Sequence, residues 1–247
     1  MSFNTKLRII NVFNHFMIIP AFMYGSFLEF GIAFSIWYIL CIVGVSGGLH
    51  RYFTHKSFTT NKFWETIMLA FSVPPTIGTP IGWVGTHRMH HAFSDSEKDP
   101  HSPQSIGLLK SQLHIWREFN LNPALVKDLI KNKSVVFVHR HYFKILLLYI
   151  AVLYCIDPVY GIFGYSIPAV FAFHGTGLVN GVCHKYGYRN FKTQDSSKNN
   201  VLVSLYSPGE GWHNNHHHSP MSSNFSHRWW EVDITYGFIK LISTNKR

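Results

Sequence analysis

The sequence predicts an all-α, polytopic membrane protein, with four transmembrane helices in two hairpins and a cytoplasmic helical cap that carries a polyhistidine site. Three observations lead to this fold class. Charged residues make up only 14% of the 247 residues, against about 25% in an average globular protein. The chain is rich in aromatic residues, with 21 Phe, 12 Tyr and 7 Trp. Two long stretches contain none of its 22 Lys and Arg residues.

The first uncharged stretch runs from Ile9 to His50 and contains a single charged residue, Glu29. It divides into residues 9–28 and 30–49, each about 20 residues long, and a helix of that length crosses a bilayer. We therefore expect a helical hairpin with Glu29 in its turn.

The second stretch covers residues 145–184 and is interrupted only by Asp157-Pro158. It predicts a second hairpin, with spans at residues 145–157 and 159–183. Several glycines in this stretch are small enough to allow close contacts between helices.

The Lys and Arg residues predict the orientation of the chain. Cytoplasmic loops carry an excess of these residues, whereas both hairpin turns carry only an acid. We expect both termini in the cytoplasm, with residues 50–144 and 184–247 forming the cap of a single domain that covers residues 1–247. The net charge of +10 suits anionic headgroups and an acidic protein partner. A solvated basic face that only sets the topology is the alternative, and no nucleic-acid partner is expected.

A further uncharged segment, Thr66 to Thr86, would cross the membrane by hydropathy alone. It contains Pro74-Pro75, Pro80 and three glycines, which would break a helix repeatedly. Crossing would also separate His87 from His50 by the width of the bilayer. We expect the segment to be embedded in the membrane or to lie at its interface, and to return to the same face.

Two other segments are expected at the membrane surface. Lys110 to Lys144 forms a basic, partly amphipathic stretch, which would lie along the surface with its aromatic residues in the lipid boundary. Arg228 to Asp233 places two Trp residues beside charges, which is typical of a membrane interface. The three cysteines form no Cys-x-x-Cys pair, which argues against a disulfide framework or a thiolate zinc site.

Histidines recur in the pattern His-x-x-His-His, once at residues 87–91 and once at residues 213–217. In a helix, such a box places its three rings on one face. His216 and His217 are then about 100° apart around the axis, so one ion can hardly take both, whereas two adjacent ions can take one each. A looser pair occurs at His50 and His55, and Asn180 and His184 stand at i and i+4. These four segments predict a two-metal centre.

The boxes resemble those of the membrane fatty acyl desaturases, and the residues around them resemble the stearoyl-CoA-like and acyl-lipid Δ9 group. The resemblance covers about Ile36 to Leu241. One departure is an extra histidine, His218, directly after the last box. The surrounding segments that carry the resemblance are Gly85 to Arg88, Asp99 to Pro103, Asn180 to His184, Gly187 to Asn190 and Gly209 to His217.

The resemblance implies two Fe ions held by nine histidines, without a further catalytic residue or organic cofactor. One iron would take His50, His55, His87, His91 and His216. The other would take His90, His184, His213 and His217, with Asn180 holding a water on it. Glu210, Asp95 and Asp99 are expected to accept hydrogen bonds from ligand ring N–H groups, with ordinary surface acids as the alternative. The other eight histidines (15, 101, 114, 139, 141, 174, 218 and 227) match no ligand position.

The acyl chain would lie in an apolar pocket between the helices. The resemblance places the end of that pocket against the second span, where Phe34 and Tyr38 stand one helical turn apart. The alternative for these aromatics is contact with lipid or packing within the bundle.

The function implied is that of an acyl desaturase, which introduces a cis double bond, expected at Δ9, into a chain carried on CoA or lipid. It would use O₂ and two electrons from a separate donor of ferredoxin or cytochrome b5 type, since no His-Pro-Gly-Gly haem motif is present. Removing hydrogen from an unactivated methylene demands such a metal oxidant. Two alternatives are a membrane di-iron hydroxylase or oxygenase on the same scaffold, and a membrane metal-binding or transport protein.

Overall fold

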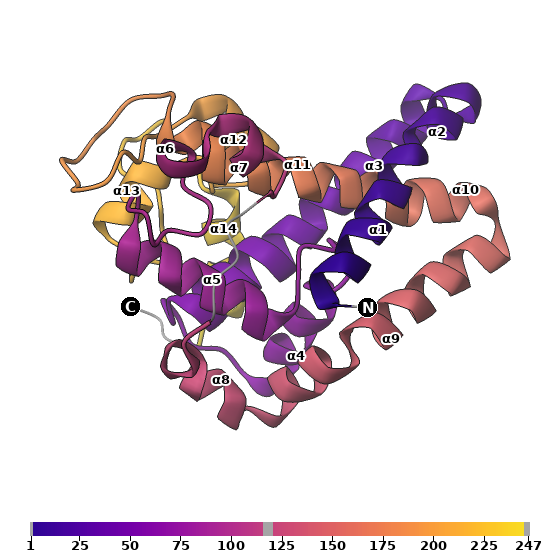
Figure 1. Ribbon diagram of the computed structural model, residues 1–247, viewed down its shortest axis with the longest axis horizontal. Coiled ribbons are helices and arrows are strands. Elements are labelled where there is room, and N and C mark those ends of the chain that lie inside the picture. Colours follow the sequence, from indigo (N-terminus) through magenta and orange to yellow (C-terminus); the bar gives the residue numbers. More distant parts are fainter. Residues whose placement is uncertain (1, 116–120, 245–247) are drawn as a thin grey trace.

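The structure is a computed structural model that describes residues 2–115 and 121–244. Within these ranges the regular elements are all helices, and extended pairing is limited to isolated bridges from Asn199 to Tyr188 and to Trp212. Long helices extend to one side of the molecule, and short helices and loops gather at the other (Figure 1). The predicted all-α class is confirmed.

Four helices are long and apolar enough to cross a membrane, judged by length and composition: Phe3–Tyr24, Phe27–Thr54, Lys133–Ile156 and Pro158–His184. The predicted number of spans is confirmed, but the bounds differ: the second and fourth helices extend past both predicted ends, and the first and third begin and end earlier than predicted. The third helix begins at Lys133 rather than at residue 145, 12 residues earlier (145 − 133). The predicted start of this helix was set directly after Lys144, the last Lys before the apolar run. A helix can continue past that point because long Lys and Arg side chains reach the membrane surface.

The first two long helices meet at Gly25-Ser26. Ser26 caps the second of them, because its hydroxyl accepts from the Leu28 N–H while its own N–H donates to Glu29 (2.8 Å). This capping box explains why the lone acid of the stretch lies at the turn. The elements are α1 (Phe3–Phe16), α2 (Ile18–Tyr24), α3 (Phe27–Leu40) and the π-helix η1 (Cys41–Thr54).

The other two long helices meet at Asp157-Pro158. The Asp157 carboxylate accepts a hydrogen bond from the Val159 N–H (2.7 Å), and Pro158 occupies the first helical position, where its missing N–H costs nothing. The elements are α9 (Lys133–Ile156), α10 (Pro158–Gly161), the π-helix η3 (Ile162–Ser166), α11 (Ile167–Gly181) and the 3₁₀-helix η4 (Val182–His184).

A buried polar network ties α1 to the second pair of helices. The Asn14 amide donates to the Tyr165 hydroxyl (3.2 Å), and Ser166 donates back to Asn14 (3.1 Å). Tyr154 of α9 contacts the same Ser166 hydroxyl (2.8 Å). Apolar surfaces alone give little preference between helix arrangements in lipid, so these hydrogen bonds fix the position of α1.

The segment Thr66 to Thr86 is broken, as predicted, and is not among the spanning helices. It comprises most of α4 (Lys62–Phe71), a turn at residues 72–79 and half of α5 (Pro80–Phe93). The Thr79 hydroxyl caps α5 by accepting from the Gly82 N–H (3.1 Å). Both helices pack against η1, so α5 brings the first histidine box beside His50.

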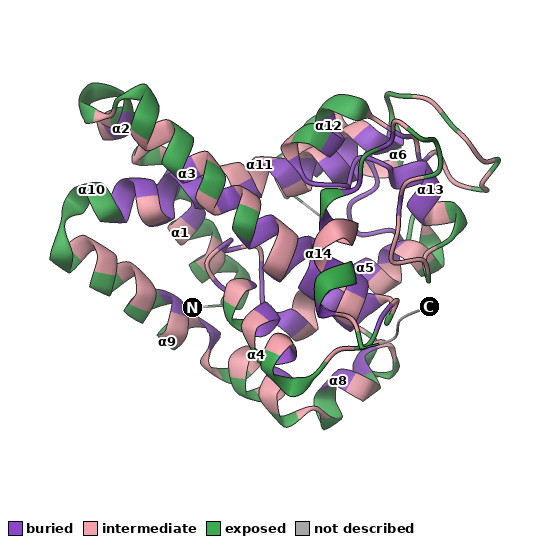
Figure 2. Cartoon of the chain, turned by 180° about the vertical axis from the view of Figure 1, so that it is seen from behind, coloured by how far each residue is buried: buried purple, intermediate pink, exposed green. Residues whose placement is uncertain are grey.

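The remaining elements are short and lie mostly around α5 and η1. The end of α9 near Lys133 joins α8, so part of the stretch Lys110 to Lys144 is the start of a long helix rather than a surface segment; residues 116–120 of that stretch lie outside the described residues. Buried residues concentrate in this half, whereas α2 and α10 are largely exposed and α9 is mostly intermediate or exposed (Figure 2). The bounds are α6 (Pro103–Ile106), α7 (Leu108–Gln112), η2 (Pro123–Val126), α8 (Lys127–Lys131), α12 (Val201–Tyr206), α13 (His213–His218) and α14 (Ile234–Ile242).

Candidate metal centre

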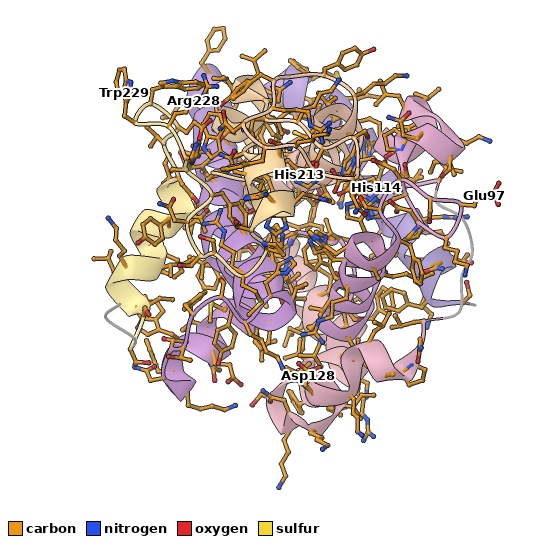
Figure 3. All side chains as sticks on the ribbon, turned by 90° about the vertical axis from the view of Figure 1, so that its left-hand side faces the viewer. Glu97, His114, Asp128, His213, Arg228 and Trp229 are labelled. Atoms are coloured by element: carbon orange, nitrogen blue, oxygen red, sulfur yellow. The ribbon has the colours of Figure 1, made fainter. Side chains whose placement is uncertain are left out.

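Nine histidines gather in the interior as two neighbouring groups, and within each group the ring nitrogens lie within 4.8 Å of one another. The first group comprises His50, His55, His87, His91 and His216. The second group comprises His90, His184, His213 and His217. Figure 3 shows His213 deep in the molecule, whereas Asp128 and Trp229 lie at its periphery. The membership of the groups is the one predicted; that each group holds a metal ion stays a prediction.

Adjacent histidines in the two boxes point into different groups. His90 and His91 follow one another near the end of α5, and His216 and His217 follow one another on α13. One member of each pair belongs to the first group and the other to the second. Helical geometry separates neighbouring side chains by about 100°, so α5 and α13 each contribute to both groups.

His50 and His55 share a group because the second spanning helix ends as a π-helix. In a regular α-helix, residues five apart point well away from each other. In η1 the hydrogen bonds run from residue i+5 to residue i, as in the bond from the His55 N–H to the His50 carbonyl (3.2 Å). The wider turn places the two rings on the same face, with centroids 5.1 Å apart. No pattern in the sequence predicted this π-helix.

The turn before α13 needs both of its glycines. Gly209 has a φ of +81°, and a Cβ there would lie 2.2 Å from the Asp233 carboxylate. A Cβ on Gly211 would lie 2.2 Å from the backbone nitrogen of Ser204. The tight turn directs Glu210 toward His50, where its carboxylate accepts from Nδ1 (2.5 Å). The motif Gly-Glu-Gly-Trp-His therefore serves both groups. Glu210 contacts His50 of the first group, and His213 belongs to the second group.

Four carboxylates hold Nδ1 atoms of the two groups. Besides Glu210, Asp99 accepts from His90 (2.8 Å) and Asp95 from His184 (3.3 Å). These three acids were the predicted acceptors. The fourth, Asp195, accepts from His217 Nδ1 (2.8 Å) and was not predicted. Its loop, Lys192 to Asn200, carries no helical spacing that would have revealed the contact.

Burial and the neighbouring histidines favour the neutral form of six rings of the two groups. Burial lowers the pKa of His90 and of His217 well below the usual range, and the nearby histidines lower it further. The same causes, in the same order, lower the pKa of His87, His91, His213 and His216. A neutral imidazole offers one nitrogen with a free electron pair, which is the form that binds metals.

The distances between ring nitrogens fit metal ligation. His90 and His217 both use Nδ1 to donate to an acid, so their Nε2 atoms face each other as bare acceptors at 3.3 Å. Two neutral acceptors at that distance repel unless a cation lies between them. At metal–nitrogen bonds of roughly 2.0–2.1 Å, neighbouring ligands of one ion lie about 3 Å apart. The other Nε2 contacts within the groups measure 3.0 Å (His50–His216), 2.9 Å (His216–His91), 3.1 Å (His91–His87) and 3.0 Å (His184–His213).

Comparison with known proteins agrees with this chemistry. A model of the fatty acid desaturase family matches residues 26–236. The chain belongs to the fatty acid desaturase family. An acyl-CoA 5-desaturase of Anemone leveillei is 33% identical over 92% of this chain and 73% of its own length. An sn-1 stearoyl-lipid 9-desaturase of Anabaena variabilis is 34% identical over 88% of this chain and 81% of its own. A palmitoyl-monogalactosyldiacylglycerol delta-7 desaturase of Arabidopsis thaliana is 34% identical over 85% and 58%. The chain is thus an oxidoreductase and, with its four apolar helices, a membrane protein.

A large cavity of the desaturase borders the first histidine group. It encloses about 1610 Å³ between α1, the turn at residues 76–79, α5 and α11. Ligand pockets commonly measure about 300–1000 Å³, so it has room for a long acyl chain. His87 of the first group lines it, as does Asn180, which lies one turn before His184. Among the described residues of the lining, Arg8 is the only one with a formal charge.

Phe34 and Tyr38 of the desaturase do not line this cavity. They stack on each other with ring centroids 5.6 Å apart, and Phe34 packs against Phe171 and Tyr206 (5.5 and 5.9 Å). The role predicted for them, closing the acyl pocket, stays a prediction. They belong to an aromatic cluster around α3, which precedes η1 in the same long helix that carries His50.

Several histidines without a predicted ligand role have other contacts in the desaturase. His218 stacks flat on Phe191 (3.9 Å between centroids), outside both groups. His101 lies over His90 (4.4 Å) and forms, with Asp99 and His90, a third cluster of metal-binding atoms that the sequence did not predict. Three others, His15, His114 and His139, line the cavity with His101.

The C-terminal segment Arg228 to Asp233 supports the site instead of simply anchoring the desaturase in a membrane. Glu231 accepts from the Asn215 amide (2.8 Å), which fixes α13. Asp233 accepts from the buried Arg51 guanidinium (3.1 Å). Trp229, in contrast, is almost fully exposed. The segment therefore combines one side chain suited to an interface with two acids that hold the centre.

Proposed function

We propose that this desaturase introduces a cis double bond, at the Δ9 position, into a saturated acyl chain carried on CoA or lipid, and that it does so at a di-iron centre. The observation that carries the proposal is the pair of histidine groups, in which nine rings converge and eight of them contact a neighbouring ring through nitrogen atoms 2.9–3.3 Å apart. Family membership supports it, and the relatives named above act on acyl-CoA or acyl-lipid substrates and differ in the position of the double bond.

The first iron would be held by the five histidines of the first group, and the second iron by the four histidines of the second group. Imidazole suits iron as a ligand. The second group has one imidazole fewer, and Asn180 is the side chain we propose to hold a water there. Two irons would supply an oxidant, made from O₂ and two electrons, that is strong enough to remove hydrogen from an unactivated methylene.

The protein's own side chains orient the ligands. Glu210, Asp99, Asp95 and Asp195 each keep the proton on Nδ1 of one ring, so that Nε2 is free to bind. Ser46 donates to Glu210, and Arg51 lies 3.5 Å from it, so this carboxylate stays ionised. The centre is thereby oriented before any metal arrives.

The acyl chain would occupy the large cavity, with the carbons to be oxidised near His87 and Asn180. An apolar chain is stabilised there because most of the lining is uncharged. Among the described residues of the lining the one formal charge is that of Arg8, which is compatible with a CoA thioester and with a lipid ester as the carrier.

We propose a single domain over residues 1–247, with the four long helices as spans in two hairpins. Residues 50–144 and 184–247 would lie mainly in a cytoplasmic cap, together with both termini. The placement of Lys and Arg supports this orientation. A cysteine introduced at Ser94 should react with a membrane-impermeant reagent only from the cytoplasmic side. Labelling from the outer side would overturn the topology.

Expression in a host that lacks its own desaturase tests the function. Mapping of double bonds in each lipid class and in the acyl-CoA pool should reveal a cis double bond at Δ9, and the purified protein should carry two irons. A hydroxylated product would favour the hydroxylase alternative. Absence of iron and of any product would refute the proposal.

A further inference from the structure

A second, smaller cavity opens beside the first histidine group. It encloses about 600 Å³, and its lining includes His55, Lys56 and Arg88, together with Lys127 and Lys131 of α8. Asp128 is its only acid among the described residues. Its position differs from that of the large cavity, because Arg88 lines the small cavity whereas the preceding residue, His87, lines the large one.

The cavity keeps an excess of positive charge after its internal pairs are counted. Asp128 accepts from Arg88 through both carboxylate oxygens (2.7 and 3.1 Å) and pairs with Lys56 (2.7 Å). Lys127 and Lys131 stand four residues apart on α8, are exposed, and have no ion pair within the described residues. Two ammonium groups in the lining therefore have no acid partner among the described residues, and a third cation, Lys56, has a side chain that is 61% exposed and shares its acid with Arg88.

His55, which lines the cavity, is a member of the first group. Its Nε2 is buried and has no hydrogen-bond partner among the described residues, and it belongs to the nitrogens that converge on the group. An electron that arrives at this cavity would reach the metal position proposed for the first group through the ring of His55. Met221, which is 67% exposed, adds an apolar side chain to the rim.

We propose that this face, defined by Lys56, Lys127, Lys131, Arg88 and Met221 around His55, is the docking site of an acidic one-electron carrier protein. The inference rests on the proposed function, which requires two electrons per double bond. Charge complementarity selects an acidic partner and accelerates its encounter, and the exposed Met221 suits a transient interface. The face lies at the periphery, where Figure 3 shows Asp128 at the edge of the molecule, away from Arg228 and Trp229.

The test uses the full-length, iron-loaded protein in lipid nanodiscs, with two acidic probes: a reduced [2Fe–2S] ferredoxin and the soluble domain of a cytochrome b5. The variant is Lys127→Glu with Lys131→Glu. The matched control is Lys98→Glu with Lys192→Glu, which makes the same change of charge at two exposed lysines outside the cavity. Binding is measured by titration of the oxidised carrier, and the KM for the reduced carrier is measured separately.

At low ionic strength we expect the Kd for the carrier that supports turnover to rise about tenfold or more in the cavity variant, and to change by about twofold or less in the control. The difference should shrink as salt is added, because exposed charges are screened. Iron content should be the same in all three proteins. Equal losses in the two variants, or no loss in either, would overturn the proposal, as would absence of binding by both carriers.

A third measurement separates docking from binding of an anionic substrate group. If the cavity variant raises the KM for the acyl substrate and leaves the carrier titration unchanged, the cavity binds that anionic group and the docking proposal is wrong. Failure of the proposed function has a different signature, since the wild-type protein would then hold no iron or form no double bond.

Discussion

The two histidine groups share the helices α5 and α13 but are held in place by different forces. In the first group, one ring of five has a carboxylate partner among the described residues, namely His50 with Glu210. Its rings pack instead on one another and on aromatic neighbours, such as Trp83 against His87 (5.1 Å) and Phe225 against His216 (4.4 Å). In the second group, three rings of four are held by an acid. Packing thus orients the first group, and hydrogen bonds orient the second.

The largest effect is expected when a ligand ring is removed from either group. His216→Ala and His217→Ala alter adjacent residues of α13 that belong to different groups. Each should abolish desaturation and lower the iron content from two toward one per chain, and His90→Ala should behave like His217→Ala. Iron analysis and product analysis on the purified variants test this. Full activity with two irons in any of these variants would break the assignment.

His218→Ala is the matched control for these substitutions. His218 stands next to the ligand positions but stacks on Phe191 outside both groups. The variant should keep two irons and most of its activity. A loss equal to that of His217→Ala would mean that substitutions in α13 act by unfolding the helix.

Removing single carboxylates should sharpen the contrast between the groups. Asp99→Asn and Asp195→Asn should each lower the affinity of the second site for iron by about 10–100-fold, the range typical of partners behind a ligand. Glu210→Gln should affect the first site and also the stability of the fold. Among the described residues it removes one of the two carboxylates that pair with the buried Arg51 and leaves Asp233 as the other, and removing a partner from a buried ion pair costs up to about 3–5 kcal/mol.

Iron affinity and thermal unfolding, measured in parallel, separate these outcomes. The Asp variants should lose iron with little change in the unfolding temperature of the metal-free protein. The Glu210 variant should lower both quantities. Equal destabilisation of the metal-free protein by all three substitutions would show that the acids act on the fold and not on ligand orientation.

A further difference between the groups concerns Asn180. The second group has one imidazole fewer than the first, and Asn180 is the side chain proposed to hold a water there. Asn180→His would give the second group a fifth ring four residues before His184. We expect the variant to keep two irons and to lose most of its activity, because the added ring would occupy the corner proposed for water. Asn180→Ala is the control, and it should lose less activity. A fully active Asn180→His enzyme would show that this corner is not needed.

The resemblance to the acyl desaturases implied the membership of both groups, and the helical spacing within the two boxes agreed with it, because it turns neighbouring rings in different directions. The sequence also predicted three of the four acids, each of which stands within or next to a recognisable motif. Asp195 and the π-helical end of the second span were missed. The first depends on a loop that folds over α13, and the second depends on a change of helical winding that apolar residues do not announce.

Packing between segments that are distant in the sequence was the other feature that the sequence could not predict. The large cavity arises where α1, α5 and α11 meet, and no local pattern signals an empty volume between three segments. The stretch Lys110 to Lys144 was expected at the membrane surface because of its charges, yet from Lys133 onward it belongs to the helix α9. Charge marked the edge of the hydrophobic run, but hydrogen bonding and packing set the start of the helix.

The smallest effect is expected on chain-length preference, and it decides which of two regions near the first group receives the end of the acyl chain. If Phe34 and Tyr38 close the pocket, Phe34→Ala or Tyr38→Ala should shift the preferred substrate toward longer chains. If the chain lies in the large cavity, a bulkier side chain in its lining, as in Thr176→Phe, should shift the preference toward shorter chains. Removing a packed aromatic ring costs about 3–5 kcal/mol, so poor expression of Phe34→Ala would say nothing about the pocket.

The measurement is the ratio of products formed from chains of about 14, 16 and 18 carbons, the common range of acyl chains in a membrane whose core is about 30 Å thick, in each variant that still binds two irons. A shift in Thr176→Phe with an unchanged ratio in Tyr38→Ala would place the chain in the large cavity and leave the aromatic cluster as packing for the helix that carries His50. The reverse result would place the chain along α3. Chain length would then be selected by Phe34 and Tyr38, on the helix that carries His50 of the first group, whereas Asn180 would bring the second group into contact with the substrate.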